Sequence, residues 1–209
     1  MSVQVVRVGR KAVEKAVGVL ERGGVIAYPT ETCYGLGADA TNAGAVEKVF
    51  QAKNRPAGKP FIVIVASETI AGKYFELNSV ARRLVREFMP GPLTLIVPAR
   101  RRLLAPRVLM NGCAAFRIPS HSFALSLARS FGKPIVSTSA NVSGEPPAYS
   151  VKRIVREFEK TSLVVDGGAL PRRKPSTIVD LTKARPVLVR AGPGAKRVQR
   201  FLDKLFSCL

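Results

Sequence analysis

Short apolar segments alternate with amphipathic segments along the whole chain, and this order constrains the fold more than any other feature of the sequence. Apolar runs bounded by Gly, Pro and polar residues predict strands, whereas apolar residues at helical spacing predict helices. Strands are predicted at 3–8, 25–28, 61–65, 93–97, 114–118, 134–136, 163–166, 177–181 and 187–190. Helices are predicted at 11–22, from Asn42 to about 53, from 78 or 79 to 89, from Ser120 to 131, at 151–158 and at 194–206. This mixed order indicates an α+β fold of mixed α/β layers rather than a bundle or a sandwich.

Length and composition predict one domain over residues 1–209. A chain of 209 residues with 46% hydrophobic content can bury one substantial core. The longest clean apolar run, at 61–66, is far too short to cross a membrane. We therefore expect a cytoplasmic protein that does not associate with membranes.

The chain is strongly basic, with 34 Lys and Arg against 14 Asp and Glu and a formal net charge of +20. Such a charge attracts polyanions, whether nucleotides or RNA. The cations lie in several clusters without interleaved aromatic residues, and no RNA-reading signature accompanies them. Composition therefore predicts affinity for anions but no sequence-specific recognition.

Two polar islands follow apolar segments about eighty residues apart. The first contains Lys53, Arg55 and Pro56 with Lys59 behind them, and the second is Ser-Thr-Ser-Ala-Asn-Val-Ser-Gly at 137–144. Fixed cations together with hydroxyl, amide and backbone N–H donors are what a triphosphate requires. The alternatives are a helix C-terminus with favourable cations for the first island and an Asx or capping turn for the second.

Seven motifs along the chain resemble those of the YrdC/Sua5 family of threonylcarbamoyl-AMP synthases. They are Y-P-T-E-T-x-Y-G-L-G at 28–37, K-x-R-P at 53–56, P-G-P-L-T at 90–94, R-x-P-x-H at 117–121, K-P-x-V-S-T-S-A-N-x-S-G at 133–144, S-T-I-V-D at 176–180 and R-x-G at 190–192. The resemblance implies a YrdC/RibB-like fold, in which a twisted mixed β-sheet flanked by helices encloses a large basic concave cavity. It also implies synthesis of threonylcarbamoyl-AMP and pyrophosphate from L-threonine, bicarbonate and ATP, for the t6A37 modification of tRNA.

The resemblance implies roles for particular side chains. Catalysis would consist mainly of positioning and charge stabilisation by Lys53, Arg55, Ser139 and Asn141, with Mg²⁺ as the cofactor. Residues implied in ATP binding are Lys53, Arg55, Lys59, Ser139, Asn141, Ser176 and Arg190, and those implied in threonine binding are Thr30, Thr32, Arg117 and Ser137. With few carboxylates in the chain, we expect phosphates and water to hold the metal, and no dedicated protein metal site.

Two features depart from the longer members of the family. Sua5-type proteins add a linker and a second domain, so a chain of 209 residues resembles the short YrdC type without a C-terminal domain. Many Sua5 sequences also carry a His that contacts threonine on the strand after K-x-R, and Ile64 occupies that position here.

Other functions stay open at this stage. A basic domain of the same fold could bind double-stranded or structured RNA, including tRNA, without chemistry, and a carbamoyl-adenylating relative would share the motifs. His121, the only histidine, lies beside a capping serine, where a structural role is more common than catalysis. Partners of a synthase would be its three substrates and the downstream t6A transferase machinery.

Overall fold

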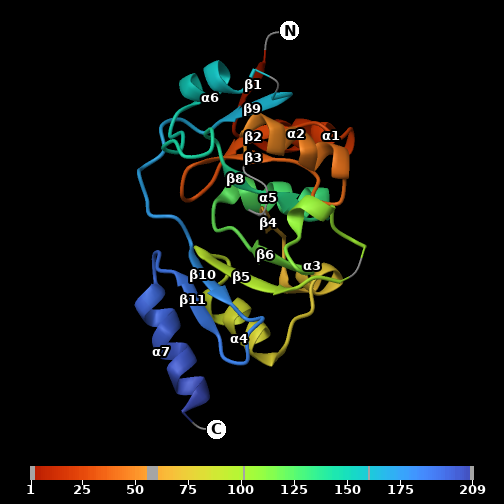
Figure 1. Ribbon diagram of the computed structural model, residues 1–209. Helices are drawn as coiled ribbons and strands as arrows, with labels where there is room; N and C mark the ends of the chain where they lie inside the picture. The colour runs from red at the N-terminus through yellow and green to blue at the C-terminus, as the bar shows by residue number, and fades with distance from the viewer. Residues whose placement is uncertain (1–2, 56–60, 101, 160, 208–209) are drawn as a thin grey trace.

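Two mixed β-sheets form the frame of the protein in a computed structural model that describes residues 3–55, 61–100, 102–159 and 161–207 (Figure 1). In the first sheet β1, β9 and β2 are parallel, and β3 is antiparallel to both β2 and β8. Its strands lie in the order β1 (Gln4–Arg7), β9 (Leu163–Asp166), β2 (Ile26–Pro29), β3 (Tyr34–Gly37) and β8 (Thr138–Ser139).

The second sheet is also mixed, with β10 parallel to β5, β4 parallel to β6, and its other neighbours antiparallel. Its strands lie in the order β11 (Val187–Arg190), β10 (Thr177–Asp180), β5 (Leu93–Pro98), β6 (Cys113–Arg117), β4 (Ile62–Ile64) and β7 (Ile135–Val136). A bridge between Asp39 and Ile135 joins the end of β3 to β7. The two sheets are therefore connected where the chain runs from β7 into β8.

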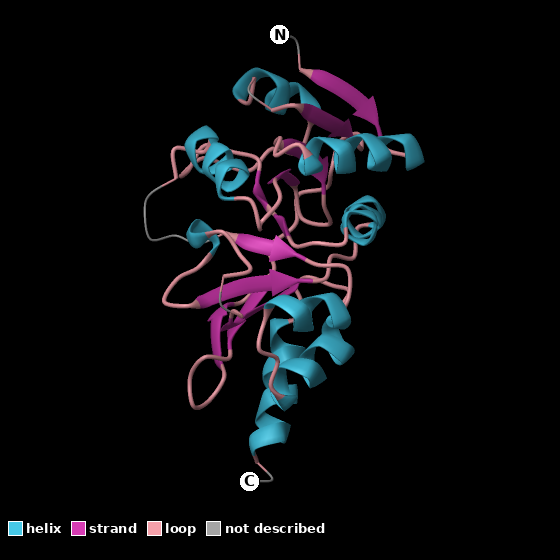
Figure 2. Cartoon of the chain, turned by 90° about the vertical axis from the view of Figure 1, so that its right-hand side faces the viewer, coloured by secondary structure: helices cyan, strands magenta, loops and turns pink. Residues whose placement is uncertain are grey.

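The helices cover the sheets at both ends of the molecule, and β1 and α7 lie at opposite ends of it (Figures 1 and 2). Helices α1 and α5 pack together with β2 around a core that includes Leu20, Tyr28 and Leu127, while α4 and α7 lie at the end of the second sheet. The helices are α1 (Arg10–Glu21), α2 (Ala43–Ala52), α3 (Glu68–Tyr74), α4 (Ser79–Phe88), α5 (Ser122–Phe131), α6 (Val151–Glu157) and α7 (Ala195–Phe206), with a 3₁₀ turn η1 at Pro106–Val108. No helix of the described chain is long and apolar enough to span a membrane.

The predicted class of mixed α/β layers is confirmed, and the predicted strands and helices are present within a few residues. Asn42 and Asn78 cap α2 and α4 through their side-chain oxygens, which accept hydrogen bonds from the N–H groups of Ala45 and Ala81. These ends were predictable because an Asn immediately before an amphipathic segment is a strong helix start.

Two local predictions are wrong, and one helix was missed. Ser120 does not cap α5, because the backbone stays extended past it and His121 occupies the N-cap position without a side-chain hydrogen bond. The predicted loop at 29–37 ends early, since Tyr34–Gly37 forms β3 between β2 and β8. Helix α3, capped by Ser67, was not predicted because its seven residues contain too few apolar positions to show a period.

Candidate functional site

The pairing of β3 with β8 brings the first loop of the chain against the second polar island. Gly35 lies opposite Ser139 in this ladder. A Cβ atom on Gly35 would lie 3.6 Å from Cγ2 of Thr30 and 3.7 Å from the Ser137 hydroxyl oxygen. Two segments that are more than a hundred residues apart in sequence thus supply polar groups to one region.

Lys53 follows the last turn of α2, and its ammonium group points into the second island. Nζ donates hydrogen bonds to the backbone carbonyls of Ser139 and Asn141, the latter at 2.6 Å, and lies 3.4 Å from Oδ1 of Asn141. The residue is only 1% exposed. Burial, with a smaller effect from Arg55, lowers the pKa of Lys53 to about 8. In this arrangement Lys53 has no free N–H to offer a phosphate.

The side-chain amide donors of Asn141 are also used in hydrogen bonds within its own segment. Its Nδ2 donates to the carbonyl oxygens of Val142 and Glu145 at 2.8 and 2.7 Å. The side chain therefore holds the turn through its amide donors, which differs from an Asx turn, in which the side-chain oxygen accepts from a backbone N–H. Ser139 differs, because its half-exposed hydroxyl takes part in no hydrogen bond with the described residues.

Arg55 is oriented differently from Lys53, although only Asn54 separates them. Asn54 has a φ of 46°, a left-handed conformation that turns the chain between the two cations. The Arg55 guanidinium lies 4.8 Å from the centre of the Phe61 ring. It is half-buried, and burial lowers its pKa. The two cations of K-x-R thus have distinct surroundings.

Thr30 and Thr32 belong to the tight loop between β2 and β3. The Thr30 hydroxyl donates to the Cys33 carbonyl oxygen at 2.6 Å and accepts from the N–H groups of Thr32 and Cys33 at 3.3 Å. The hydroxyl oxygens of Thr30 and Thr32 lie 3.1 Å apart. Thr30 therefore shapes the loop, and Thr32, which is less buried, is the more available of the two.

Arg117, at the end of β6, forms a buried ion pair that the sequence analysis did not predict. Its Nη1 lies 2.6 Å from Oε1 of Glu31, and the two side chains are 7% and 8% exposed. Among the described residues, Glu31 Oε2 and Arg117 Nε have no hydrogen-bond partner, and the same holds for the Tyr28 hydroxyl and Nδ1 of His121. Glu31 was visible within the T-E-T motif, but nothing in the sequence indicated which cation would face it.

These unpartnered atoms lie in a poorly solvated region. Burial raises the pKa of Tyr28 to about 12, against smaller lowering effects, first from the neighbouring Ser137 hydroxyl and then from Arg117. Burial also lowers the pKa of His121, against the opposing effect of Glu31. Buried polar atoms without partners are expensive in a folded protein and are expected where a ligand supplies the missing hydrogen bonds.

Ser176 and Arg190 form a second polar cluster with Thr94. Arg190 donates from Nε to the Ser176 carbonyl at 2.8 Å and from Nη2 to its hydroxyl at 3.0 Å, and that hydroxyl lies 2.9 Å from Oγ1 of Thr94. Burial and then the charge of Arg117 lower the pKa of Arg190. In the β5–β6 ladder Leu95, next to Thr94, lies opposite Phe116, next to Arg117. The cluster thus borders the Arg117 region.

The comparisons with known proteins agree with this arrangement. The sequence profile of the Sua5/YciO/YrdC family, described as "Telomere recombination", matches residues 18–192. The chain belongs to this family.

Two relatives and one solved structure show the extent of the likeness. The threonylcarbamoyl-AMP synthase of Pyrococcus abyssi is 40% identical over 181 residues, which cover 85% of this chain and 53% of the relative. That of Thiobacillus denitrificans is 43% identical over 169 residues, which cover 79% of this chain and 89% of the relative. The structure of P. abyssi Sua5 complexed with L-threonine superimposes with a TM-score of 0.82 at 37% identity, over 90% of this chain and 56% of that one. The chain therefore spans about half of the Pyrococcus protein and most of the Thiobacillus protein.

Several implied features of this Sua5/YciO/YrdC site stay predictions. Lys59 and Pro56 lie outside the described residues. The described residues contain no group of three or more His, Cys, Asp or Glu placed to hold a metal ion, and the nearby Glu31 is already paired. That phosphates and water would hold Mg²⁺ stays a prediction.

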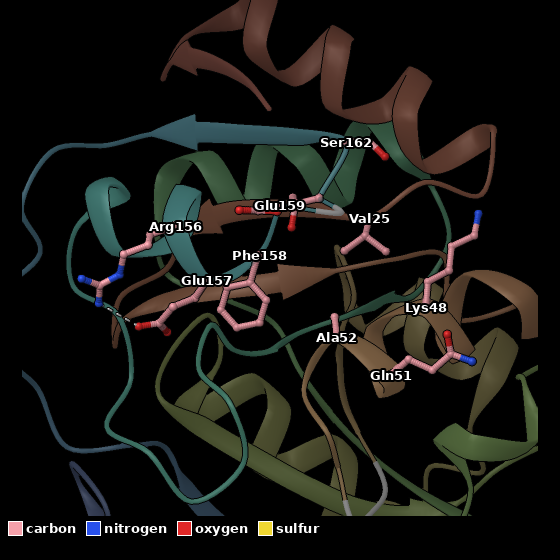
Figure 3. Close-up of a pocket in the computed structure, with 10 residues that line it drawn as sticks. Val25, Lys48, Gln51, Ala52, Arg156, Glu157, Phe158, Glu159 and Ser162 are labelled. Carbon is pink, nitrogen blue, oxygen red and sulfur yellow. Dashed lines mark hydrogen bonds and ion pairs between the residues drawn. The ribbon is translucent and has the colours of Figure 1, made fainter. Parts of the chain in front are cut away.

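A cavity of about 570 Å³ is lined by none of these predicted site residues (Figure 3). Figure 3 shows residues of α2 on one side of it and residues of α6 on the other. Its lining consists of Val25, Lys48, Gln51, Ala52, Arg156, Glu157, Phe158, Glu159, Thr161 and Ser162. None of these residues was predicted to bind substrate, so the large basic cavity implied by the family stays a prediction.

Proposed function

We propose that this chain joins L-threonine, bicarbonate and ATP into threonylcarbamoyl-AMP and releases pyrophosphate. The observation that carries the proposal is the pairing of β3 with β8, which brings the loop with Thr30 and Thr32 beside the second polar island. The buried ion pair of Arg117 and Glu31 supports the proposal, because Glu31 Oε2 and Arg117 Nε have no hydrogen-bond partner among the described residues. Both curated relatives described above are named threonylcarbamoyl-AMP synthase, which is the activity proposed here.

The proposed nucleotide contacts use side chains from both polar islands and from the Ser176–Arg190 cluster. Arg55 would take a phosphate through its planar donors, and the Ser139 hydroxyl would take a phosphate or the ribose. Ser176 and Arg190 would close the nucleotide side, with Lys59 as a further predicted contact. Mg²⁺ on the triphosphate would neutralise part of its charge and favour departure of pyrophosphate.

The proposed threonine contacts lie in the other half of the site. Arg117 would bind the carboxylate, while Thr32, Thr30 and Ser137 would contact the hydroxyl or amine. The amine would attack CO₂ formed by dehydration of bicarbonate and would lose a proton to give a carbamate. A carbamate oxygen would then attack the α-phosphate, and pyrophosphate would leave. The protein's part in both steps would be to hold the reacting atoms in line and to stabilise the developing charge.

Further parts of the proposal concern partners. The labile product would pass to t6A transferase machinery in the cytoplasm and so reach tRNA. A domain that only binds double-stranded RNA is the second candidate, and the net charge of +20 is the observation in its favour.

Pyrophosphate release from Mg²⁺-ATP by the purified chain tests the synthase proposal. Release should require both L-threonine and bicarbonate and should fall by at least about 100-fold in Arg55→Met, since a phosphate contact made in the transition state is lost. Lys48→Met is the matched control, because Lys48 lies on α2 and donates to the carbonyl of Gly23, away from the site. Release that ignores the omission of threonine would refute the synthase, and RNA binding without any release would favour the second candidate.

A further inference from the structure

The ammonium group of Lys53 is enclosed by the chain segment that carries Ser139 and Asn141. We propose that Lys53 and Asn141 form a clasp that positions this segment, and that Lys53 acts on the nucleotide through Ser139 rather than by touching phosphate. The inference rests on the proposed function. It assigns different roles to the two cations of the K-x-R motif, with Lys53 as a positioning residue and Arg55 as a phosphate contact.

The donor count of Lys53 is the first support. A lysine ammonium has three N–H donors and no acceptor. Three oxygens surround Nζ, namely the carbonyl oxygens of Ser139 and Asn141 and the side-chain Oδ1 of Asn141. With the residue 1% exposed, no donor and no surface remain for a phosphate oxygen. Contact with phosphate would require this buried set of hydrogen bonds to break.

The reciprocal bonds are the second support, because the segment binds Lys53 from more than one side. The N–H of Ser143 donates to the Lys53 carbonyl oxygen at 2.9 Å, and the Asn141 N–H donates to the Ser139 carbonyl at 3.0 Å. Both Nδ2 donors of Asn141 are used within the turn, on Val142 and Glu145. The polar groups of Lys53 and Asn141 are therefore satisfied inside the protein, whereas the buried Ser143 hydroxyl has no partner among the described residues.

The outcome of this arrangement is a fixed Ser139. On one side its strand pairs with β3 at Gly35, and on the other its carbonyl is held by Lys53. Its hydroxyl has no partner among the described residues and is left for the ligand. Arg55 is turned elsewhere by the left-handed Asn54 and is the cation suited to phosphate.

A nucleotide series separates positioning from contact. Affinities for ATP, ADP and AMP are measured by calorimetry for the wild type, Lys53→Met, Arg55→Met and the control Lys48→Met, after each variant is shown to be folded. A clasp that places Ser139 on the ribose or the α-phosphate, which all three nucleotides share, predicts that Lys53→Met weakens all three by the same factor, about 10- to 100-fold. Arg55→Met should instead lose less affinity as phosphates are removed.

Three results would overturn the clasp or its basis. A loss in Lys53→Met that shrinks from ATP to AMP would show direct phosphate contact. Wild-type affinities in folded Lys53→Met would show that the residue supports only the fold. A wild type that binds none of the three nucleotides would refute the proposed function, and the clasp would then fail as a device for nucleotide binding.

Labelling of amines in the wild type tests the same inference without any substitution. With an acylating reagent and mass spectrometry, exposed Lys48 should react readily, while Lys53 should react slowly with and without ATP because its ammonium is enclosed. Rapid labelling of Lys53 that ATP suppresses would place the amine in the phosphate site and refute the clasp, even if Lys53→Met failed to fold.

Discussion

The Arg117–Glu31 ion pair should stabilise the fold only as a pair, and removing one member should be severe. We predict that Glu31→Gln lowers the free energy of unfolding by about 3–5 kcal/mol, because it leaves a buried guanidinium without its counter-charge. Arg117→Met should have a loss of similar size. The double variant should lose much less than the sum, since neither charge is then left alone.

The magnitude follows from the geometry of the pair. Nη1 and Oε1 are 2.6 Å apart and both side chains are less than a tenth exposed, so water screens the attraction little. Two charges about 4 Å apart at an effective dielectric constant of about 20 attract by about 4 kcal/mol. Desolvation of both groups offsets most of this attraction in the intact pair but remains in full when one partner is removed.

Urea denaturation followed by far-ultraviolet circular dichroism measures the four proteins at one pH and one ionic strength. The coupling energy from the double-mutant cycle should be about 2–3 kcal/mol. Glu68→Gln is the control, because Glu68 bonds Arg82 and Arg86 at the surface, where such pairs contribute about 0–1 kcal/mol. Additive losses for Glu31 and Arg117, or a loss in Glu31→Gln no larger than in the control, would refute this account of the pair.

Three further predictions concern stability and are measured by the same urea denaturation. Gly192→Ala should destabilise the fold by about 3 kcal/mol, since its Cβ would lie 2.2 Å from the carbonyl oxygen of Pro175; an unchanged midpoint would contradict this. Tyr34→Phe should lose about 2 kcal/mol, because the Tyr34 hydroxyl donates to the Gly168 carbonyl at 2.7 Å and accepts from the Gly167 N–H at 2.9 Å. The pKa of Lys53 is lowered from 10.5 to about 8 on folding, so the unfolded chain binds the proton more tightly between these values. Wild-type stability should therefore rise with pH across this window by up to about 1.4 kcal/mol per pH unit relative to Lys53→Met, and parallel profiles would contradict the shift.

The elements of the fold were predictable where local chemistry decides them. An Asn before an amphipathic run marked the starts of α2 and α4, and β-branched runs marked the central strands. Strand β3 was not predictable locally, because Gly35 and Gly37 weaken a strand in isolation. The conformation of β3 is set by its pairing with β2 and β8. Gly37 permits this close packing, since a Cβ there would lie 2.7 Å from the Tyr28 ring. Pairing on both sides therefore overrides the low strand preference of this segment.

The candidate site was predictable as a set of residues but not as a set of contacts. The sequence places Glu31 and Arg117 in separate motifs, and only the fold brings their side chains within 2.6 Å. The three acceptors of Lys53 are likewise 86 and 88 residues away along the chain. Sequence spacing gives the type of donor at each position, whereas the number of donors already in use depends on tertiary structure.

This difference decides how a polar motif should be interpreted. Lys53 and Arg55 are both cations two residues apart, and a motif alone assigns both to the phosphates. Lysine has three donors, and all three are used by Ser139 and Asn141, so its charge acts on the protein itself. Arginine has five donors in a planar fork, and Arg55 is half-buried beside the Phe61 ring. A lysine at position 55 could not reproduce the fork, and an arginine at position 53 would place five donors among three acceptors. The two positions of K-x-R should therefore not tolerate exchange of their cations.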